Sequence, residues 1–308
     1  MTSTAQARPR PLAPVEGRAT SVRQRLADYV ELTKPRIVAM VLVATLVGYY
    51  LGCPGLPQLV ALLHTLVGTA LAAAGTLTLN QVMEVERDAR MERTRRRPLP
   101  EGRIAMADAL VFGVALLALG LTWLALGANV LSAILTATIT VTYLFLYTPL
   151  KSVTSLCSIV GAVPGALPPV VGWVAARGSL GAEPWVLFAI MFLWQIPHSL
   201  AIGRMYRDDF ARAGIRLLPV VDWNGTHTGR QVVSNCLALL PVGVLPTLMG
   251  LAGVTYFLVA LGLGLAFLWS AIGLWRRESA ADARRLLFAS LVYLPVLLAV
   301  MALDKLAS

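Results

Sequence analysis

The sequence predicts an all-α integral membrane protein whose chain crosses the bilayer nine times. Hydrophobic residues make up 57% of the chain and charged residues 14%, and the mean hydropathy is +0.72, which is far more apolar than a soluble domain of this length. Apolar runs of about 18 to 25 residues are long enough to span a bilayer as helices. Short connections make consecutive helices antiparallel neighbours, and the nine runs are residues 36–53, 58–82, 104–126, 129–148, 153–175, 184–203, 230–251, 254–275 and 286–303.

The distribution of basic residues orients the predicted bundle, because arginine and lysine are retained on the cytoplasmic side of a membrane. Of the 26 basic residues, 24 fall in the N-terminal tail or in the connections after the second, fourth, sixth and eighth runs. Only Arg177 and Lys305 fall on the opposite side. We therefore expect the N-terminus and both acidic loops to face the cytoplasm. Topology explains the net charge of +10, and no soluble basic face is available for a nucleic-acid partner.

The ends of the chain and its cysteines carry weaker signals. Residues 1–30 are rich in Pro, Ala and Arg and are expected to form a disordered cytoplasmic tail before a single transmembrane domain over residues 31–308. No apolar signal core lies near the start, so we expect a bacterial inner membrane; the Arg-rich, acid-poor tail leaves the mitochondrial inner membrane as the alternative. The three cysteines are too widely spaced for a disulfide framework or a zinc site, and helix packing accounts for Cys53, Cys157 and Cys236.

A first polar cluster follows the second apolar run, in the segment LNQVMEVERDARMERTRRRPLP at residues 79–100. If the helix continues past the membrane surface, a spacing of four residues aligns Asn80, Glu84 and Asp88 along one stripe. Two like charges one turn apart destabilise a helix, so a cation is expected between Glu84 and Asp88. Hard oxygen ligands of this kind suit Mg²⁺, which completes its coordination with water and substrate phosphate.

The remaining charges of this segment have more ordinary interpretations. Glu86 points away from the stripe and stands four residues before Arg90, and Glu92 stands likewise before Arg96, as in helical ion pairs. The guanidinium group of arginine can donate two parallel hydrogen bonds to phosphate oxygens. An oxygen-rich metal site beside several guanidinium groups therefore indicates a diphosphate site. For each arginine, a solvated loop that obeys the positive-inside rule stays open as the alternative. The guanidinium groups in question are those of Arg93, Arg95, Arg96 and Arg97.

A second polar cluster follows the sixth apolar run, on the same predicted side. Asp208 has Arg204 and Arg212 four residues away on either side, so helical pairing explains it. Asp209 has no such partners, and we predict that it is the better metal ligand, with Asp208 in support. Each cluster is also followed by a similar tetrapeptide, RPLP at residues 97–100 and RLLP at residues 216–219. Two acidic groups over one cavity would hold Mg²⁺ from both sides of a diphosphate.

The chain has three histidines, of which His198 is the functional candidate. An ionisable group inside a span is a candidate by default, and on a continuous helix His198 would share a face with Asp209 about 16 Å away. A neutral His198 bonded to a backbone carbonyl is the open alternative. His64 is interpreted as a packing or interhelical hydrogen-bonding residue, and His227, in a loop, is expected to have no chemical role.

Six segments together resemble the membrane prenyltransferases of the UbiA superfamily, whose members carry Asn/Asp-rich motifs after the second and sixth helices. Within that superfamily the chain most closely resembles the branch that farnesylates haem. No segment is decisive alone, but all six occur in order. They are LTKPRI (32–37), MERTRRRPL (91–99), YTPLKSVT (147–154), GAVPGALPPVVGW (161–173), WQIPHS (194–199) and YRDDFARAGIRLLPVV (206–221).

The resemblance implies a fold, a reaction and partners. The fold is a nine-helix bundle around a central cavity, with the two acidic motifs on cytoplasmic loops. The reaction is the Mg²⁺-dependent conversion of haem b, farnesyl diphosphate and water into haem O and diphosphate. Membrane lipid surrounds such an enzyme, and haem A synthase or a terminal oxidase are the candidate protein partners.

The resemblance also assigns roles to individual residues of this chain. The first metal motif corresponds to Asn80, Glu84 and Asp88, and the second to Tyr206 and Asp209. His198 corresponds to a histidine that approaches haem iron or a propionate. The family usually has Asp where this chain has Glu84 and Glu86, so each of these side chains is one methylene longer than in the family motif. The basic residues expected to bind the substrate diphosphate, together with Tyr206, are Lys34, Arg36, Arg93, Arg97 and Lys151.

Three other functions stay open at this stage. A related prenyltransferase would act on a quinone precursor or a chlorophyll-type acceptor, although MERT and WQIPHS favour haem. A transporter or channel would also carry charges and a pseudo-repeat, but here the charges gather in two loops and the spans are nearly free of them. A haem-binding assembly factor would not need Glu84, Asp88 and Asp209.

Overall fold

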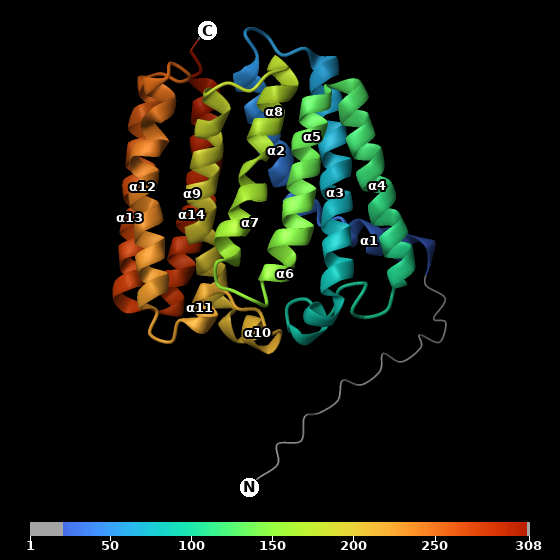
Figure 1. The fold of residues 1–308 in the computed structure, drawn as a ribbon. Helices are drawn as coiled ribbons and strands as arrows, with labels where there is room; N and C mark the ends of the chain where they lie inside the picture. Colours follow the sequence, from blue (N-terminus) through green and yellow to red (C-terminus); the bar gives the residue numbers. More distant parts are fainter. Residues whose placement is uncertain (1–20, 307–308) are drawn as a thin grey trace.

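The computed structural model describes residues 21–306, and within that range every regular element is helical except one isolated antiparallel bridge between Ala252 and Lys305. Among the described residues, nine segments are long and apolar enough to cross a membrane. They stand side by side in one bundle (Figure 1). The all-α fold class and the nine spans predicted from the sequence are therefore confirmed.

The spans follow the predicted order along the chain. Most are single helices: α2 (Pro35–Gly52), α3 (Leu59–Arg90), α4 (Met106–Gly127), α9 (Glu183–Met205), α12 (Thr226–Leu248), α13 (Val254–Arg277) and α14 (Ala280–Leu303). One composite span joins α5 (Val130–Val141), the π-helix η1 (Thr142–Tyr147) and α6 (Thr148–Leu150). The other joins α7 (Cys157–Ala166) to α8 (Pro168–Arg177). Helices too short to span are α1 (Val22–Leu32), α10 (Arg207–Arg212) and α11 (Leu218–Val221).

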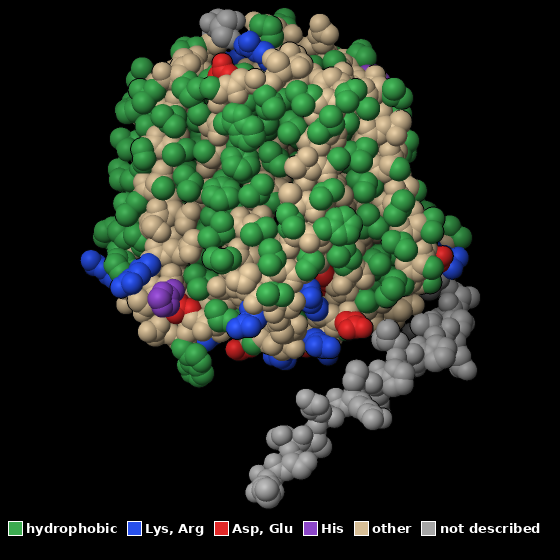
Figure 2. All heavy atoms as spheres, in the orientation of Figure 1, with side chains coloured by type: hydrophobic (Ala, Val, Ile, Leu, Met, Phe, Trp, Pro, Cys, Tyr) green, Lys and Arg blue, Asp and Glu red, His purple; other side chains and the backbone are tan. Residues whose placement is uncertain are grey.

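The two ends of the bundle differ in their side chains. Figure 2 shows a hydrophobic lateral surface, with Lys, Arg, Asp and Glu gathered mainly at the end that carries α10 and α11. We call this the charged end, and it includes the loop at residues 91–105. The opposite end, with the loops at residues 53–58 and 178–182, is the far end. Helix α3 has 32 residues, about 48 Å at 1.5 Å per residue, so it extends beyond the hydrocarbon at the charged end as the sequence predicted.

Glycines let the helices that support the charged end pack closely, as is common between membrane helices. A Cβ on Gly172 of α8 would lie 1.9 Å from the Thr45 carbonyl oxygen of α2. On α4, a Cβ at Gly120 would lie 2.4 Å from the Ala72 nitrogen of α3. Because backbone rather than side-chain atoms would be hit, larger residues at these positions would push α2 from α8 and α3 from α4.

The π-helix η1 brings two tyrosines to the inside of the bundle. Pro149 of α6 has no amide hydrogen to donate to the preceding turn. The Thr148 hydroxyl instead donates to the Tyr143 carbonyl oxygen at 2.9 Å. Tyr143 and Tyr147 both lie in this π-helix and both line the cavity described below, in keeping with the frequent occurrence of π-turns at functional sites.

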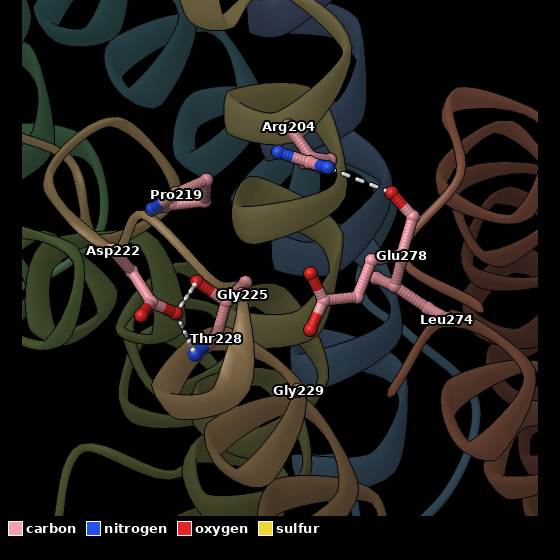
Figure 3. Close-up of a pocket in the computed structure, with 8 residues that line it drawn as sticks. All are labelled: Arg204, Pro219, Asp222, Gly225, Thr228, Gly229, Leu274 and Glu278. Carbon is pink, nitrogen blue, oxygen red and sulfur yellow. Dashed lines mark hydrogen bonds between the residues drawn. The ribbon is translucent and has the colours of Figure 1, made fainter. Parts of the chain in front are cut away.

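A small cavity of about 10 Å³ marks where the segment after α11 meets α9, α12 and α13 (Figure 3). The Asp222 carboxylate accepts hydrogen bonds from the backbone N–H and the hydroxyl of Thr228 at 2.7 and 2.8 Å, which caps the first turn of α12. Arg204 donates to the Glu278 carbonyl oxygen at 2.7 Å. The Asp222 bonds fix the end of α11 to α12, and the Arg204 bond fixes α9 to the turn after α13.

The N-terminal part of the chain corrects one expectation. Residues 1–20 lie outside the described residues, but residues 22–30, expected to be disordered, are part of α1. The Ser21 hydroxyl oxygen accepts a hydrogen bond from the Gln24 N–H at 3.2 Å, which caps the helix. The prediction of disorder was wrong here because it averaged composition over the whole tail, whereas residues 22–32 make specific contacts with the bundle.

Candidate functional site

A cavity of about 440 Å³ lies at the charged end of the bundle. Its walls come from the start of α2, the end of α3, the loop that follows, η1, α7, α9 and the α10–α11 segment. The central cavity expected from the sequence is therefore present. Its polar lining consists of Lys34, Asn80, Glu84, Asp88, Arg93, Arg97, Tyr143, Tyr147, Lys151, Ser158, Gln195 and Ser199.

The predicted stripe on α3 faces this cavity. Asn80, Glu84 and Asp88 are all buried residues and all line it, as a spacing of four residues on one helix requires. Glu86, between them, is exposed. The convergence of three oxygen-bearing side chains is thus found as predicted, while their role as metal ligands stays a prediction.

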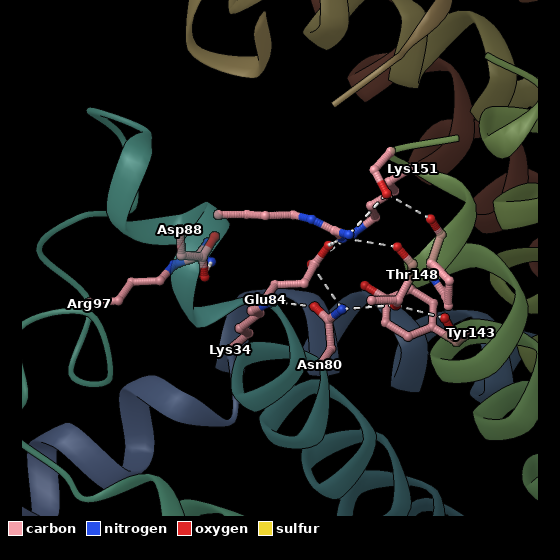
Figure 4. Close-up of polar contacts among 11 residues, drawn as sticks. Lys34, Asn80, Glu84, Asp88, Arg97, Tyr143, Thr148 and Lys151 are labelled. Carbon is pink, nitrogen blue, oxygen red and sulfur yellow. Dashed lines mark hydrogen bonds and ion pairs between the residues drawn. The ribbon is translucent and has the colours of Figure 1, made fainter. Parts of the chain in front are cut away.

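A basic side chain neutralises each carboxylate of the stripe (Figure 4). Lys151 Nζ donates to Glu84 Oε1 and Oε2 at 3.0 and 2.8 Å. Arg97 Nη1 donates to Asp88 Oδ2 at 2.6 Å. Two like charges one turn apart are therefore tolerated because a cation sits against each of them.

Asn80 links the stripe to the start of α2. Its amide donates to Glu84 Oε2 at 2.9 Å, and its Oδ1 accepts from Lys34 Nζ at 3.2 Å. Burial, followed by the positive charges of Arg97 and Lys151, lowers the pKa of Lys34 to about 7. Near neutral pH, Lys34 is therefore poised to gain a proton when an anion enters the cavity.

The loop after α3 returns two arginines to the cavity. The Thr94 hydroxyl donates to the Asp88 carbonyl oxygen at 2.8 Å, which folds the loop back on the end of α3. Arg93 and Arg97 line the cavity, whereas the exposed residues Arg95 and Arg96 do not. Of the four arginines considered for a diphosphate site, the structure thus brings two to the cavity.

The ion pairs predicted for this loop need correction. Glu92 pairs with Arg95, not with Arg96. No ion pair between Glu86 and Arg90 occurs among the described residues. The four-residue spacing does not hold beyond Arg90, because α3 ends there and Met91 is extended, with φ −97° and ψ 130°.

The second acidic cluster reaches the first one through Asp209. Its carboxylate accepts hydrogen bonds from the backbone N–H groups of Glu92 at 3.1 Å and Arg93 at 3.3 Å. Burial opposes ionisation of Asp209, but these donors and Arg212 keep its pKa below the usual value. Segments more than a hundred residues apart therefore meet at one loop, while the shared metal site of the two clusters stays a prediction.

The partners of the two aspartates are the reverse of those predicted. Asp209 forms the ion pair with Arg212, whereas Asp208 is exposed and Arg204 binds the Glu278 carbonyl oxygen. Helix α9 ends at Met205 and α10 starts afresh, so spacings across this break are not helical. Neither aspartate is among the residues that line the cavity, and their role as metal ligands stays a prediction.

The other residues that the resemblance assigned to the diphosphate lie at different depths. Lys34 and Lys151 line the cavity. Arg36 is exposed and does not. Tyr206 lies outside the lining, but its ring packs against the Arg93 guanidinium, 5.4 Å from ring centroid to Cζ, so it supports a cavity residue.

His198 does not line the cavity, although the next residue of α9, Ser199, does. Its Nδ1 is 2.8 Å from the Ser290 hydroxyl of α14, and its ring stacks on Trp194 at 4.9 Å between centroids. Because α9 ends at Met205, the continuous helix that would have joined it to Asp209 does not exist. The predicted haem contact remains a prediction. His64 packs near Trp123 at 5.6 Å.

The sequence interpretation missed several cavity residues. Tyr143 and Tyr147 come from η1, and Gln195 and Ser199 from α9. Gln195 Nε2 donates to the Ala162 carbonyl oxygen at 2.5 Å. The motifs YTPLKSVT and WQIPHS contain three of these residues, so their polar side chains within apolar runs were the available signal.

A second, apolar cavity of about 140 Å³ adjoins the polar one. It shares the lining residues Ile37, Tyr143 and Gly165 with the larger cavity. Its remaining walls are aliphatic residues, prolines and threonines of α2, α3, α5, α7 and α8. The site therefore offers charged groups at one end and an apolar compartment that continues into the bundle.

A membrane bundle that joins a cavity of carboxylates and cations to an apolar compartment has the parts of a membrane prenyltransferase. Comparison with protein families agrees, since residues 41–292 match the UbiA prenyltransferase family. The chain belongs to this family.

Individual relatives are similar over almost the whole chain. A protein from Solibacter usitatus (strain Ellin6076), named protoheme IX farnesyltransferase, is 48% identical over 289 residues, which cover 91% of this chain and 99% of that protein. A solved structure of digeranylgeranylglyceryl phosphate synthase superimposes with a TM-score of 0.77 at 17% identity, covering 91% of this chain and 98% of that one. A UbiA homologue from Archaeoglobus fulgidus, bound to DMAPP and Mg²⁺, gives 0.67 at 17% identity, covering 89% and 99%.

Proposed function

We propose that this chain transfers the farnesyl group of farnesyl diphosphate to a vinyl group of haem b, with addition of water, and releases haem O and diphosphate. The similarity to protoheme IX farnesyltransferase supports the choice of substrates. The structural observation that carries the proposal is the polar cavity at the charged end, which adjoins an apolar one. A prenyl diphosphate has the same division into a charged head and an apolar tail.

The basic residues of the cavity are suited to the diphosphate head. Lys34, Arg97 and Lys151 each contact Asn80, Glu84 or Asp88 in the structure, and Arg93 lines the same space. When a diphosphate enters, these cations exchange a carboxylate or amide partner for a phosphate oxygen. Fixed cations stabilise the negative charge that grows on the diphosphate as the C1–O bond breaks.

The residues of the α3 stripe fit a magnesium ion. Asn80, Glu84 and Asp88 line one cavity, and their amide and carboxylate oxygens are the ligand type that Mg²⁺ prefers. When bound, Mg²⁺ would supply Lewis-acid neutralisation of the leaving diphosphate. We propose Asn80, Glu84 and Asp88 as its ligands on α3, and Asp209, with Asp208 in support, as the contribution of the second cluster.

The apolar cavity is suited to the isoprenoid tail. Its lining is almost entirely apolar, and the Thr76 and Thr140 hydroxyls bond to each other at 2.8 Å, whereas the Thr69 hydroxyl has no hydrogen-bond partner among the described residues. A tail held there excludes water from C1 until the acceptor is in position. Exclusion of water matters because water would capture the allylic cation before the vinyl group does.

The acceptor half of the reaction needs no protein nucleophile. The vinyl π-electrons form the new C–C bond to farnesyl C1, and diphosphate leaves with the electrons of the C–O bond. Water then adds to the resulting cation beside the porphyrin ring and loses a proton, which yields the hydroxyethylfarnesyl group. We propose that His198, next to the cavity, contacts the haem through iron or a propionate.

We also propose the orientation and the setting of the enzyme. The excess of basic residues at the charged end favours a cytoplasmic location for the site and the N-terminus. A bacterial inner membrane is the proposed location, with the mitochondrial inner membrane as the alternative. Haem A synthase or a terminal oxidase are the proposed protein partners that use the product.

One assay tests the proposal. Purified protein is mixed with haem b, farnesyl diphosphate and Mg²⁺, and the products are identified by mass. We expect haem carrying a hydroxyethylfarnesyl group, and no product when Mg²⁺ is chelated. If only a quinone precursor is prenylated, the acceptor is wrong, and absence of any prenylated product with either acceptor would point to transport or haem binding without chemistry.

A further inference from the structure

Helix α1 has an apolar surface that nothing in the described part of the chain covers. Val22, Leu26 and Val30 are 76%, 63% and 57% exposed, and their spacing of four residues aligns them on one side of the helix. In Figure 1, α1 runs across the long axes of the spans near the charged end and projects sideways from the bundle. Figure 2 shows hydrophobic side chains at the edge of this projection.

The opposite side of α1 is firmly attached to the protein. Leu32 and Asp28 are buried, and Asp28 forms an ion pair with Arg103 of the loop after α3. The Tyr29 ring packs edge-on against Phe112 of α4, with 4.9 Å between centroids. The exposed stripe is therefore not a side of the helix that could turn inward, because the other side is already committed to the bundle.

Two unpaired cations accompany the exposed stripe. Arg23 and Arg25 are exposed, and neither takes part in an ion pair within residues 21–306. The acidic residues of α1 are engaged elsewhere, since Asp28 is buried and Glu31 lies 3.6 Å from Arg103. A helix with an apolar stripe and flanking arginines has the chemistry of a helix that lies in the interface of an anionic membrane.

Chain connectivity keeps α1 at the membrane surface. Only Thr33 and Lys34 separate α1 from α2, the first span, so the helix cannot leave the end of the bundle. The stripe then continues the hydrophobic lateral surface of the spans, which lipid already covers. From these observations we propose that α1 is an interfacial helix, with Val22, Leu26 and Val30 inserted among the acyl chains and Arg23 and Arg25 bound to anionic phospholipid head groups.

This attachment has a consequence for the site, which rests on the proposed function. Leu32 at the end of α1 accepts a hydrogen bond from Gln81 Nε2 at 2.7 Å through its carbonyl oxygen. Lys34 follows in the left-handed region, with φ 51° and ψ 63°, an unfavourable conformation for a residue with a Cβ. The contacts of α1 hold this turn, and the turn aims Lys34 at Asn80. Lipid binding by α1 therefore supports the position of a diphosphate-binding lysine.

The first experiment measures the depth of α1 in the full chain, reconstituted in nanodiscs of phosphatidylcholine with or without phosphatidylglycerol. An environment-sensitive fluorophore is attached to Leu26→Cys or to the matched control Ala27→Cys, an exposed position about 100° around the same helix. The native cysteines are buried, so the introduced thiol is the one labelled. We expect brominated lipid to quench the label at position 26 and aqueous iodide to quench that at position 27. Equal quenching of both by iodide would overturn the proposal.

The second experiment tests the arginines. Arg23→Gln/Arg25→Gln is compared with Arg276→Gln/Arg284→Gln, which removes the same charge from exposed positions at the turn between α13 and α14. In the first variant, phosphatidylglycerol should shift the emission of the position-26 label several-fold less than in the labelled chain that keeps its arginines. In the second variant the shift should equal that of this labelled chain. An unchanged lipid response in the first variant would show that the arginines do not bind anionic lipid.

The third experiment tests whether membrane insertion of α1 affects the proposed enzyme activity. In Val22→Ser/Leu26→Ser/Val30→Ser we expect a several-fold higher KM for farnesyl diphosphate with little change in kcat. If label depth follows the prediction but this KM is normal, α1 is an anchor without influence on Lys34. If the unmodified chain inserts α1 yet yields no prenylated haem, the proposed function fails and the interfacial helix stands.

Discussion

The two ends of the bundle both contain basic side chains beside buried groups, but they use them differently. At the charged end, Lys151 and Arg97 pair with Glu84 and Asp88 around a cavity of about 440 Å³. At the far end, Lys305 Nζ donates to the carbonyl oxygens of Tyr50 and Cys53, at 2.7 and 2.6 Å. Lys151 and Arg97, which line the cavity, have exchangeable anionic partners, whereas Lys305 at the far end binds backbone.

The far-end contacts explain why two basic residues depart from the charge asymmetry of the chain. Arg177 Nε donates to the Gly52 carbonyl oxygen at 3.0 Å, so Arg177 and Lys305 together satisfy carbonyl groups at the C-terminal end of α2. Carbonyl groups in the last turn of a helix are short of backbone donors and carry partial negative charge. Basic residues at the far end therefore stabilise a helix terminus, and substitutions at the two ends should separate activity from stability.

The largest effect is expected from Asp88→Ala. Loss of this carboxylate removes a proposed magnesium ligand and frees Arg97, so turnover should fall by about 100-fold or more. Steady-state product formation measures the loss, and Glu86→Ala, an exposed position on the same helix, is the control. Near-normal turnover of Asp88→Ala in a membrane-inserted protein would refute the metal role.

A somewhat smaller effect is expected from Lys151→Ala. The substitution leaves Glu84 with a weaker set of donors and removes one cation from the proposed diphosphate site. A hydrogen bond to a charged group contributes about 1.5–3 kcal/mol, so kcat/KM for farnesyl diphosphate should fall about 10- to 100-fold. Arg36→Ala, at an exposed position outside the cavity, should have a smaller effect; equal losses would mean that proximity to the cavity does not decide the role.

The two aspartates of the second cluster should differ. Asp209→Asn weakens the acceptor for the backbone N–H groups of Glu92 and Arg93, and we expect about a 10-fold loss of activity. Asp208→Asn changes an exposed side chain and should lose less. The ratio of the two activities, measured at saturating Mg²⁺, tests whether Asp209 is the more important aspartate of the second cluster. A larger loss for Asp208→Asn would give that role to Asp208.

His198→Ala tests the acceptor side of the cavity. We expect haem binding to weaken about 5-fold, as for loss of one polar contact within a membrane bundle, with less change in farnesyl diphosphate binding. Titration with each substrate separately measures the difference. An equal effect on both ligands would indicate that His198, bonded to Ser290 and stacked on Trp194, only packs α9 against α14.

Lys305→Ala should change stability rather than activity. Two carbonyl oxygens lose their donor, which should lower the free energy of unfolding by about 1–3 kcal/mol. Thermal denaturation in detergent measures the change, and kcat per folded molecule should stay the same. A loss of kcat without loss of stability would remove the distinction between the two ends.

The sequence predicted those features that depend on local periodicity. The nine spans follow from hydropathy, and the convergence of Asn80, Glu84 and Asp88 follows from helical spacing within one long helix. The pairing of Asp208 and Asp209 was assigned wrongly because it depends on where α9 ends. Tyr143 was missed because its place in the cavity lining depends on how η1 packs against α3 and α7, which spacing alone does not reveal.

Helix α1 was missed for a different reason. The composition of residues 1–30 as a whole resembles that of a disordered tail. The ion pair of Asp28 with Arg103 and the ring contact of Tyr29 with Phe112 form only in the folded chain. The apolar positions Val22, Leu26 and Val30 were visible as a four-residue repeat. Their meaning depends on which side of the helix the bundle covers, and that is a property of the tertiary structure.

The central claim is that one cavity at the charged end binds the diphosphate through its basic residues and the metal through the α3 stripe. An experimental structure of the full chain with Mg²⁺ and a non-hydrolysable farnesyl diphosphate analogue tests it most directly. We predict a diphosphate in contact with Lys34, Arg97 and Lys151, a metal on the Asn80, Glu84 and Asp88 stripe, and the tail in the apolar cavity. Density for the diphosphate at the far end, or a metal away from α3, would contradict the account.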